Sequence, residues 1–184
     1  MSEITKKALG TSIKKLLMKS ELSNITIKDI TDDCGVNRQT FYYHFKDVYD
    51  LIEWVFINEV IEEIKEDDTY ESWQQGFLYI FNYVQTNKKF IINTYNSISR
   101  DYIMKFLYKQ TNMLLINVIN EKSKNIKIKE DDKKNIADFY KYGFVGTIEQ
   151  WIANGMKEDP EKIVQKLNII IEGNFEKAIN ALQI

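Results

Sequence analysis

The chain has 184 residues, of which 44% are hydrophobic and 28% charged, and its formal net charge is −2. These proportions are typical of a soluble globular protein of one or two domains with a substantial core. No apolar run approaches the roughly 20 residues of a membrane span, and the first residues lack the apolar stretch of a secretory signal. We therefore expect a cytoplasmic protein without a membrane partner.

Cysteine and histidine are too scarce for the usual metal and redox sites. The chain has one cysteine, Cys34, and one histidine, His44, so an intrachain disulfide is excluded and a structural zinc site of four such ligands is disfavoured. The seven glycines are scattered and form no phosphate-binding loop. His44 lies in a short basic and aromatic segment, which disfavours a catalytic triad. The sequence predicts no enzyme, no catalytic residue, no metal and no cofactor.

Apolar residues recur at spacings of three and four, and proline occurs once. This pattern predicts an all-α fold of about nine helices. We expect the first helix over Glu3–Lys19. Thr26 is a natural N-cap for a second helix, with Asp29 in the capping-box position, and Gly35 can close that helix in a left-handed conformation. Asn37 can cap a third helix from Arg38 to about His44.

The remaining chain predicts longer helices. A fourth helix is expected over Val48–Glu66, followed by a boundary near Glu66–Ser72. The aromatic-rich block Trp73–Tyr108 is expected to contain two or three helices, with breaks near Asn87–Lys89 and Ser97–Ser99, and Asn120–Asp132 reads as a loop. A further helix is expected over Asp131–Asn154, and Asp159 followed by Pro160 opens a last helix that runs to about Leu182.

The two short helices hinged at Cys34-Gly35-Val36 have the layout of a helix-turn-helix, which places its second helix in the DNA major groove. Phe41 and Phe45 would anchor that helix, and its polar face would remain free. Residues 1–48 hold eight basic against six acidic residues, a weak excess of positive charge. Arg38 is one of two arginines in the chain, and arginine suits bidentate contact with guanine. Tyr42, Tyr43 and His44 follow Arg38 on this helix, and their alternative role is packing against the first helix.

The pattern Thr-Ile-x-x-Ile-x-x-x-x-Gly-Val-x-x-x-Thr-Phe-Tyr-Tyr-His-Phe, with the apolar helix after it, resembles the DNA-binding domain of the TetR family of transcriptional regulators. The resemblance covers about residues 8–55. It implies a DNA-binding domain over residues 1–47 and a C-terminal helical regulatory and dimerisation domain over residues 48–184. It also implies contacts to an operator in double-stranded DNA from Thr26, Lys28, Asn37, Arg38, Gln39, Thr40, Tyr42, Tyr43 and His44.

One position departs from the family pattern. Members commonly have a lysine at the start of the fourth helix that touches a phosphate, whereas this chain has Val48. Lys46, two residues earlier, is the candidate replacement, and we include it among the DNA-binding residues. The alternative is that Val48 belongs to the core stripe of the fourth helix and that this phosphate contact is lost.

A second resemblance concerns the C-terminal part. The pattern Gly-x-x-Gly-x-x-x-x-Trp-Ile-x-x-Gly, followed by a helix that starts at proline, is similar to the C-terminal domain of TetR-family regulators of dihydroxyacetone kinase. The two long C-terminal helices have wide apolar faces, which suit a symmetric four-helix interface between two subunits. We expect a homodimer whose interface includes Tyr140, Gly143, Gly146, Thr147, Trp151, Leu167, Ile171 and Phe175.

The family also implies control by a small-molecule or protein effector. Aromatic side chains that line such a pocket are expected to be Trp54, Trp73, Phe77, Phe81, Tyr95, Tyr102 and Phe106. The alternative role of these residues is ordinary core packing. The sequence thus predicts a homodimeric regulator, a repressor released by its effector. The alternatives are an activator controlled by a protein partner and a helical protein-interaction module.

Overall fold

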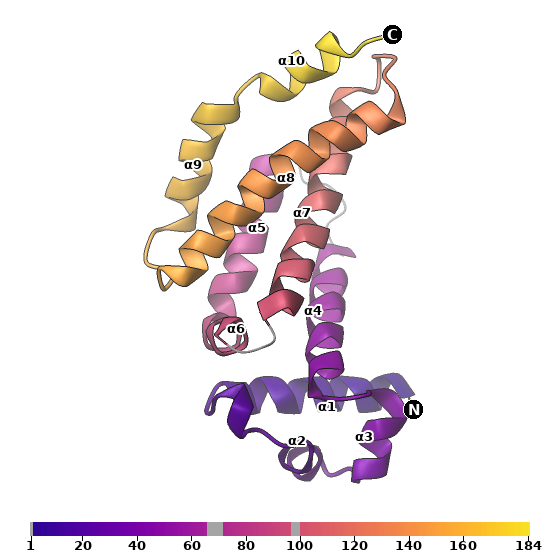
Figure 1. Ribbon diagram of the computed structural model, residues 1–184, viewed down its shortest axis with the longest axis vertical. Coiled ribbons are helices and arrows are strands. Elements are labelled where there is room, and N and C mark those ends of the chain that lie inside the picture. Colours follow the sequence, from indigo (N-terminus) through magenta and orange to yellow (C-terminus); the bar gives the residue numbers. More distant parts are fainter. Residues whose placement is uncertain (1, 66–71, 97–99) are drawn as a thin grey trace. The chain divides into compact units, whose positions relative to one another are not determined.

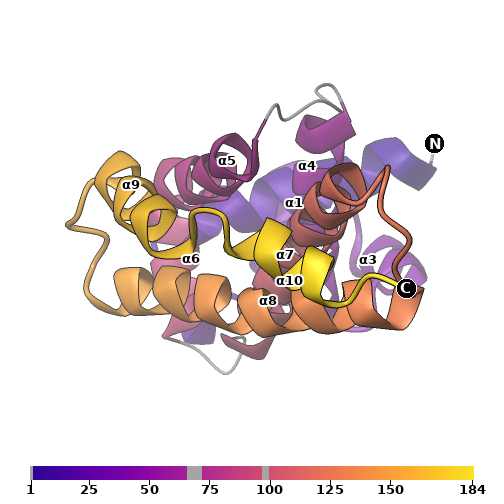
Figure 2. The same cartoon turned by 90° about the horizontal axis from the view of Figure 1, so that it is seen from above.

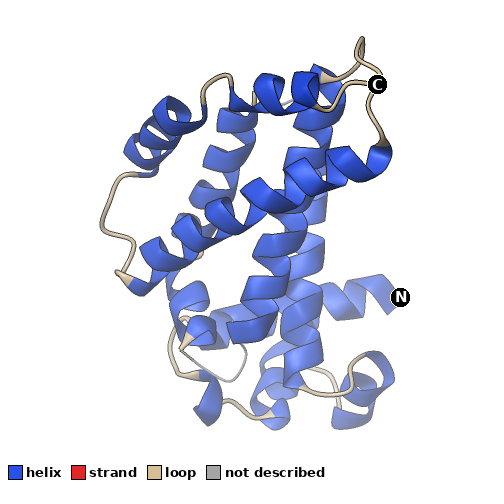
Figure 3. Ribbon diagram, turned by 45° about the horizontal axis from the view of Figure 1, so that its top comes forward, coloured by secondary structure: helices blue, strands red, loops and turns tan. Residues whose placement is uncertain are grey.

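The computed structural model describes residues 2–65, 72–96 and 100–184, and every regular element in these ranges is helical (Figure 3). The all-α class is therefore confirmed. The elements in chain order are α1 (Ser2–Leu17), the short 3-10 helix η1 (Leu22–Asn24), α2 (Ile27–Cys34), α3 (Arg38–His44), α4 (Val48–Lys65), α5 (Trp73–Thr86), α6 (Lys88–Tyr95), α7 (Arg100–Lys122), α8 (Glu130–Ala153), α9 (Pro160–Ile171) and α10 (Asn174–Ala181).

Several expected boundaries are confirmed and others are wrong. The break between α5 and α6 falls at Asn87, as expected, whereas α7 continues to Lys122 into the stretch expected to be a loop. The expected last helix is two helices, because Gly173 adopts a left-handed conformation with φ 71° between α9 and α10. The expected boundary near Glu66–Ser72 and the break at Ser97–Ser99 fall almost wholly on residues 66–71 and 97–99, outside the described residues.

The helices pack as two compact units. The first lies within Met1–Asp68 and Asn87–Phe106, and the second within Thr69–Thr86 and Leu107–Ile184. The expected domain boundary after residue 47 stays a prediction, since a packing unit and a functional domain need not coincide.

In the first unit α1 contacts α2, α3, α4 and α6, and α2 and α3 lie together on one side of α1 (Figure 1). Gly10 permits the approach of α4, because a Cβ at that position would meet the Trp54 ring and a Val55 methyl at 3.1 Å. The core of this unit is aliphatic and aromatic, and its largest fully buried side chains are Leu9, Ile13, Leu17, Ile30, Phe41, Leu51, Ile52, Phe56 and Phe90.

In the second unit α9 packs against α5, and α10 packs against α8 (Figure 2). Its core is built on aromatic rings. Phe77 contacts Phe81 and Phe144, with ring centroids 5.0 and 4.4 Å apart, and Phe81 also contacts Trp151 at 4.9 Å. No described helix combines the length and apolarity that a membrane span requires.

Candidate nucleic-acid interface

The N-terminus of α2 is closed by Thr26 and Asp29. The Thr26 hydroxyl accepts from the Asp29 amide at 3.2 Å, and the Asp29 carboxylate accepts from the Thr26 amide at 2.8 Å, which completes the expected capping box. Hydrogen bonds from the Thr26 side chain and backbone lower the pKa of Asp29. The carboxylate therefore already supplies negative charge where a phosphate would bind. Lys28, which is exposed, is the cation nearest this helix end in sequence.

The turn between α2 and α3 depends on Gly35. Its φ is 71°, and its amide donates to the Thr31 carbonyl. The Val36 amide donates to the same oxygen at 3.0 Å. Only glycine adopts this left-handed conformation without strain from a Cβ. The neighbouring Cys34 thiol is half-buried, and burial raises its pKa.

The start of α3 is fixed by Asn37. Its side-chain oxygen accepts from the Thr40 amide at 2.8 Å and from the Thr40 hydroxyl at 2.9 Å. Both residues are predicted DNA contacts, and in this conformation their polar groups stabilise the helix end. The bonds between these two residues therefore hold the start of α3 in its helical conformation.

The opposite faces of α3 differ as the sequence predicts. Phe41 is fully buried and Phe45 is 3% exposed, and the Phe45 ring meets the Trp54 ring with centroids 5.8 Å apart. Tyr42 and Tyr43 are 49% and 82% exposed. Packing inside the domain therefore does not account for these two tyrosines.

The exposed face of α3 holds one organised pair. An Arg38 Nη2 donates to the Tyr42 hydroxyl at 3.2 Å, and the guanidinium lies 5.5 Å from the centre of the Tyr42 ring. Gln39 is exposed beside them. His44 is half-buried and contacts the Tyr43 ring edge-on, with centroids 4.9 Å apart.

The start of α4 is where the family's phosphate-contacting lysine is replaced by Val48, which is half-buried. The Asp50 amide donates to Asp47 at 2.9 Å, and the Asp50 carboxylate accepts from the Lys46 amide at 2.9 Å. The Lys46 side chain is exposed. The backbone of Lys46 is thus held while its ammonium group stays accessible, as the predicted phosphate contact requires.

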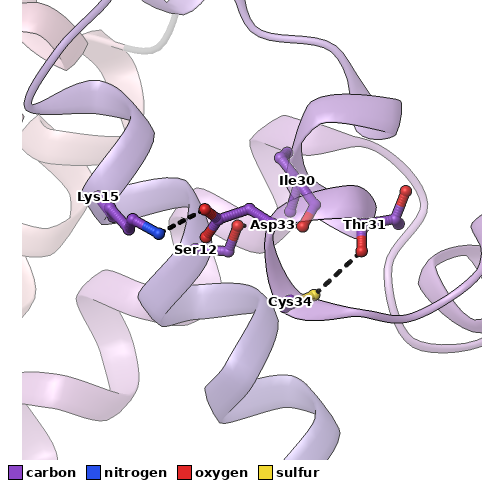
Figure 4. A network of polar contacts seen from close by, with 6 residues as sticks. All are labelled: Ser12, Lys15, Ile30, Thr31, Asp33 and Cys34. Carbon is purple, nitrogen blue, oxygen red and sulfur yellow. Dashed lines mark hydrogen bonds and ion pairs between the residues drawn. The ribbon is translucent and has the colours of Figure 1, made fainter.

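A second set of bonds fastens α2 to α1. The buried Ser12 hydroxyl donates to the Ile30 carbonyl at 3.0 Å, and Lys15 forms an ion pair with Asp33 at 2.5 Å (Figure 4). The Lys15 hydrogen bond lowers the pKa of Asp33. In the same unit the Asn93 amide on α6 donates to the Leu17 carbonyl at 2.6 Å. These bonds orient α2 on α1, which also contacts α3.

The predicted effector residues are divided between the two units. Trp54, Tyr95, Tyr102 and Phe106 belong to the first unit, whereas Trp73, Phe77 and Phe81 belong to the second. Most contact other rings: Tyr102 stacks on Tyr49, Phe106 meets Phe56, and Trp73 meets Phe144. Burial raises the pKa of Tyr102. These contacts are those of ordinary core packing, and the predicted pocket stays a prediction.

Three surface pockets of the second unit have accessible volumes of about 720, 460 and 590 Å³. The first lies along the end of α8, beside Gln150, Asn154 and Lys157. Of the predicted effector residues only Trp73 lines any of the three, and it lines the 460 Å³ pocket with residues of α7, α9 and α10.

The predicted dimer residues divide into exposed and internal ones. Gly143 and Gly146 on α8 are exposed, and a Cβ at either would meet nothing within 4 Å. Trp151, Ile171 and Phe175 are 4%, 7% and 2% exposed, so they face the interior of their own unit. Thr147, Leu167 and Tyr140 are half-buried, and the Tyr140 ring contacts the Phe175 ring at 4.4 Å.

Four large apolar side chains on α8 and α9 are exposed and are not among the predicted dimer residues. They are Phe139 and Tyr142 on α8, at 75% and 63%, and Ile169 and Ile170 on α9, at 77% and 68%. These residues belong to the apolar pattern of each helix. The pattern alone does not distinguish the apolar side chains that are buried within the subunit from those that remain exposed.

Comparison with known proteins agrees with this architecture. Residues 71–173 match the family described as the C-terminal region of TetR-type transcriptional regulators. Over 113 residues the chain is 29% identical to the HTH-type dhaKLM operon transcriptional activator DhaS of Lactococcus lactis subsp. lactis strain IL1403. That match spans 61% of this chain and 60% of the relative, so about three fifths of each protein are aligned.

Two solved structures share the fold over nearly the whole chain. The dihydroxyacetone kinase operon activator DhaS has a TM-score of 0.72 at 23% identity and covers 98% of this chain and 99% of its own. The TetR family repressor AlkX from Dietzia sp. strain DQ12-45-1b has a TM-score of 0.52 at 14% identity and covers 95% and 97%.

The fold and the family match together define a helix-turn-helix transcriptional regulator. The chain belongs to the TetR family of transcriptional regulators, with a C-terminal region of the type found in DhaS.

Proposed function

We propose that this regulator binds operator DNA by inserting α3 into the major groove. The observation that carries this proposal is the division of α3 into a buried side, Phe41 and Phe45, and an exposed side with Arg38 and Tyr42. A short helix anchored in this way presents its polar side chains to base edges without losing its own packing.

Apart from Tyr42, the predicted contacts divide into three chemical roles in this proposal. Arg38 reads guanine through bidentate hydrogen bonds, and Gln39 pairs with adenine. Tyr43, His44, Lys46 and Lys28 contact phosphates and set the position of the helix on the duplex. Thr26, Asn37 and Thr40 hold the helix ends and lie at the edge of the interface.

We further propose that the regulator is a homodimer whose α8 and α9 helices form the interface. The support is the exposed apolar set Phe139, Tyr142, Ile169 and Ile170, together with the exposed glycines on α8. Large apolar side chains that stay exposed on a subunit are typical of a subunit interface. Two copies related by a twofold axis would present two α3 helices to two half-sites.

For the direction of control, our proposal from the sequence is a repressor that an effector releases from DNA. The second candidate is an activator, and the 29% identity to the Lactococcus lactis activator of the dhaKLM operon favours it. Deleting the gene separates the two: transcription from the regulated promoter rises on loss of a repressor and falls on loss of an activator.

The DNA-binding proposal is tested by footprinting genomic fragments and then measuring affinity for the fragment found, at a stated salt concentration. We expect Arg38→Ala to weaken binding about 10- to 100-fold, which corresponds to about 1–3 kcal/mol for a lost bidentate contact. Lys177→Ala, an exposed lysine on α10, is the matched control and should bind as the wild type does.

Undiminished binding by the Arg38 variant would refute this placement of the interface. Absence of binding to any genomic fragment at low salt would favour the remaining alternative, a helical protein-interaction module.

A further inference from the structure

Two adjacent polar side chains on α7 are buried, and the part of the chain that the structure describes offers them no hydrogen-bond partner. Gln110 is 2% exposed and Thr111 is fully buried. Neither the amide nitrogen nor the amide oxygen of Gln110, nor the hydroxyl of Thr111, has a partner among the described residues. Nearly all buried polar atoms in folded proteins are paired, so three unpaired atoms on consecutive residues need an explanation.

Packing alone does not explain them. Leu107, Leu114 and Leu115, which lie one turn before and after on the same helix, are buried and apolar. A leucine or methionine at position 110 would fill similar space without the cost of an unpaired amide. Polar residues that reduce the stability of a core are typical of functional sites.

We propose that Gln110 and Thr111 are the polar anchors of an effector site inside the second unit, and that the effector is an uncharged molecule with a hydrogen-bond donor beside an acceptor. This inference rests on the proposed function, because it supplies the site through which an effector would act.

The chemistry of the two side chains defines the ligand class. The Gln110 amide donates through nitrogen and accepts through oxygen, and the Thr111 hydroxyl does both. A hydroxyketone or a carboxamide complements this arrangement. The buried polar side chains among the described residues include no charged group, so a charged ligand would lose its hydration without gaining a counter-charge.

The position of the pair also connects binding to structure. Gln110 and Thr111 line none of the three pockets described above, and their side chains are at most 2% exposed. A ligand therefore reaches them only when the packing around α7 opens. Occupancy then favours one arrangement of the helices over another, and this difference in affinity is what an effector requires.

The test is thermal unfolding of the full-length protein with hydroxyacetone and propionamide as neutral probes and propionate as a charged molecule of similar size. We expect both neutral probes to raise the melting temperature of the wild type in a concentration-dependent manner, and propionate to leave it unchanged. Gln110→Met should melt about 2–4 °C higher than the wild type without any probe, because an unpaired amide is removed, and no probe should raise it further.

Gln85→Met is the matched control, because Gln85 is an exposed glutamine on α5. This variant should keep the probe response of the wild type. The proposal is overturned if neither neutral probe raises the melting temperature of the wild type, if Gln110→Met keeps the response, or if Gln110→Met melts lower than the wild type. The last result would mean that the amide is paired within the fold.

Operator binding of the wild type and of Gln110→Met without probes is measured in parallel. If neither protein binds DNA, the proposed function is refuted. The melting temperatures then decide by themselves whether Gln110 and Thr111 form a ligand site. Normal DNA binding without any probe response would refute the site alone.

Discussion

At the scale of single residues, the pair Arg38 and Tyr42 is the most informative feature of the exposed face of α3. The two residues are one helical turn apart, a spacing that lets their side chains meet. The hydrogen bond of 3.2 Å and the position of the guanidinium over the ring restrain the arginine before any DNA is bound. A side chain that is already ordered loses less entropy on binding. We infer that Tyr42 orients Arg38 for base reading.

This role gives a prediction for Tyr42→Phe, which keeps the ring and removes the hydroxyl. We expect discrimination between the operator and a version with its contacted guanine replaced to fall about 5-fold, in line with about 1 kcal/mol for one hydrogen bond. Affinity for unrelated DNA, measured in the same titration, should not change. If the hydroxyl instead contacts a phosphate, the variant weakens binding to all sequences equally, and the orienting role is wrong.

At the scale of elements, α2 and α3 have eight and seven residues, too few to be stable as isolated helices. Their conformations depend on local caps and on the support of α1. Thr26 and Asn37 satisfy amides at the two N-termini, Gly35 sets the direction of the chain between them, and Ser12 ties α2 to α1. The angle between α2 and α3 therefore depends on a few bonds that substitutions can remove one at a time.

Gly35→Ala tests the turn. The left-handed conformation at φ 71° costs an alanine about 1–2 kcal/mol, so we expect the free energy of unfolding to fall by about that amount. Operator affinity should fall as well, because α3 is reoriented. Gly35→Asn is the matched variant and should lose less, since asparagine tolerates this conformation better than alanine does. Equal losses from both, measured by urea unfolding, would show that the backbone conformation is not the cause.

At the scale of the whole molecule, the exposed apolar residues of α8 and α9 have no partner within the described subunit that removes them from water. Of the four residues on these helices, Phe139 and Ile169 are more than 70% exposed. Burying such side chains stabilises an assembly by roughly 25 cal/mol per Å² of apolar surface removed from water. Gly146 leaves room on the same helix for another backbone to approach. Together these features support our proposal of a twofold dimer.

We predict that Gly146→Leu dissociates the dimer, because its side chain occupies the space that an approaching helix needs. In analytical ultracentrifugation the variant should sediment as a monomer at concentrations where the wild type is a dimer. It should also lose the affinity gained from two linked half-sites. Asn117→Leu, at an exposed position on α7, adds the same side chain elsewhere and should remain dimeric. A Gly146→Leu variant that stays dimeric would place the interface on another surface.

The local features of the DNA-binding part followed from the sequence because their causes are local. Thr26 and Asp29, Gly35, and Asn37 act within four residues of themselves, and their caps and turn are observed as expected. Phe41 and Phe45 are buried as the helical spacing predicted. The last helix was predicted wrongly as continuous, because a single glycine in a long apolar pattern is compatible with both a helix and a break.

The sequence by itself determined the all-helical class, the family and the two sides of α3, since each depends on residue type at short spacing. Only the tertiary structure decided which aromatic residues are internal. Trp151 and Phe175 face their own core, whereas Phe139 and Tyr142 face outward. All of them belong to wide apolar faces, and a helix with such a face can be rotated against its neighbours in several ways that the pattern does not distinguish. For the same reason the buried Gln110 amide, which has no partner among the residues that the structure describes, became visible only once α7 was packed.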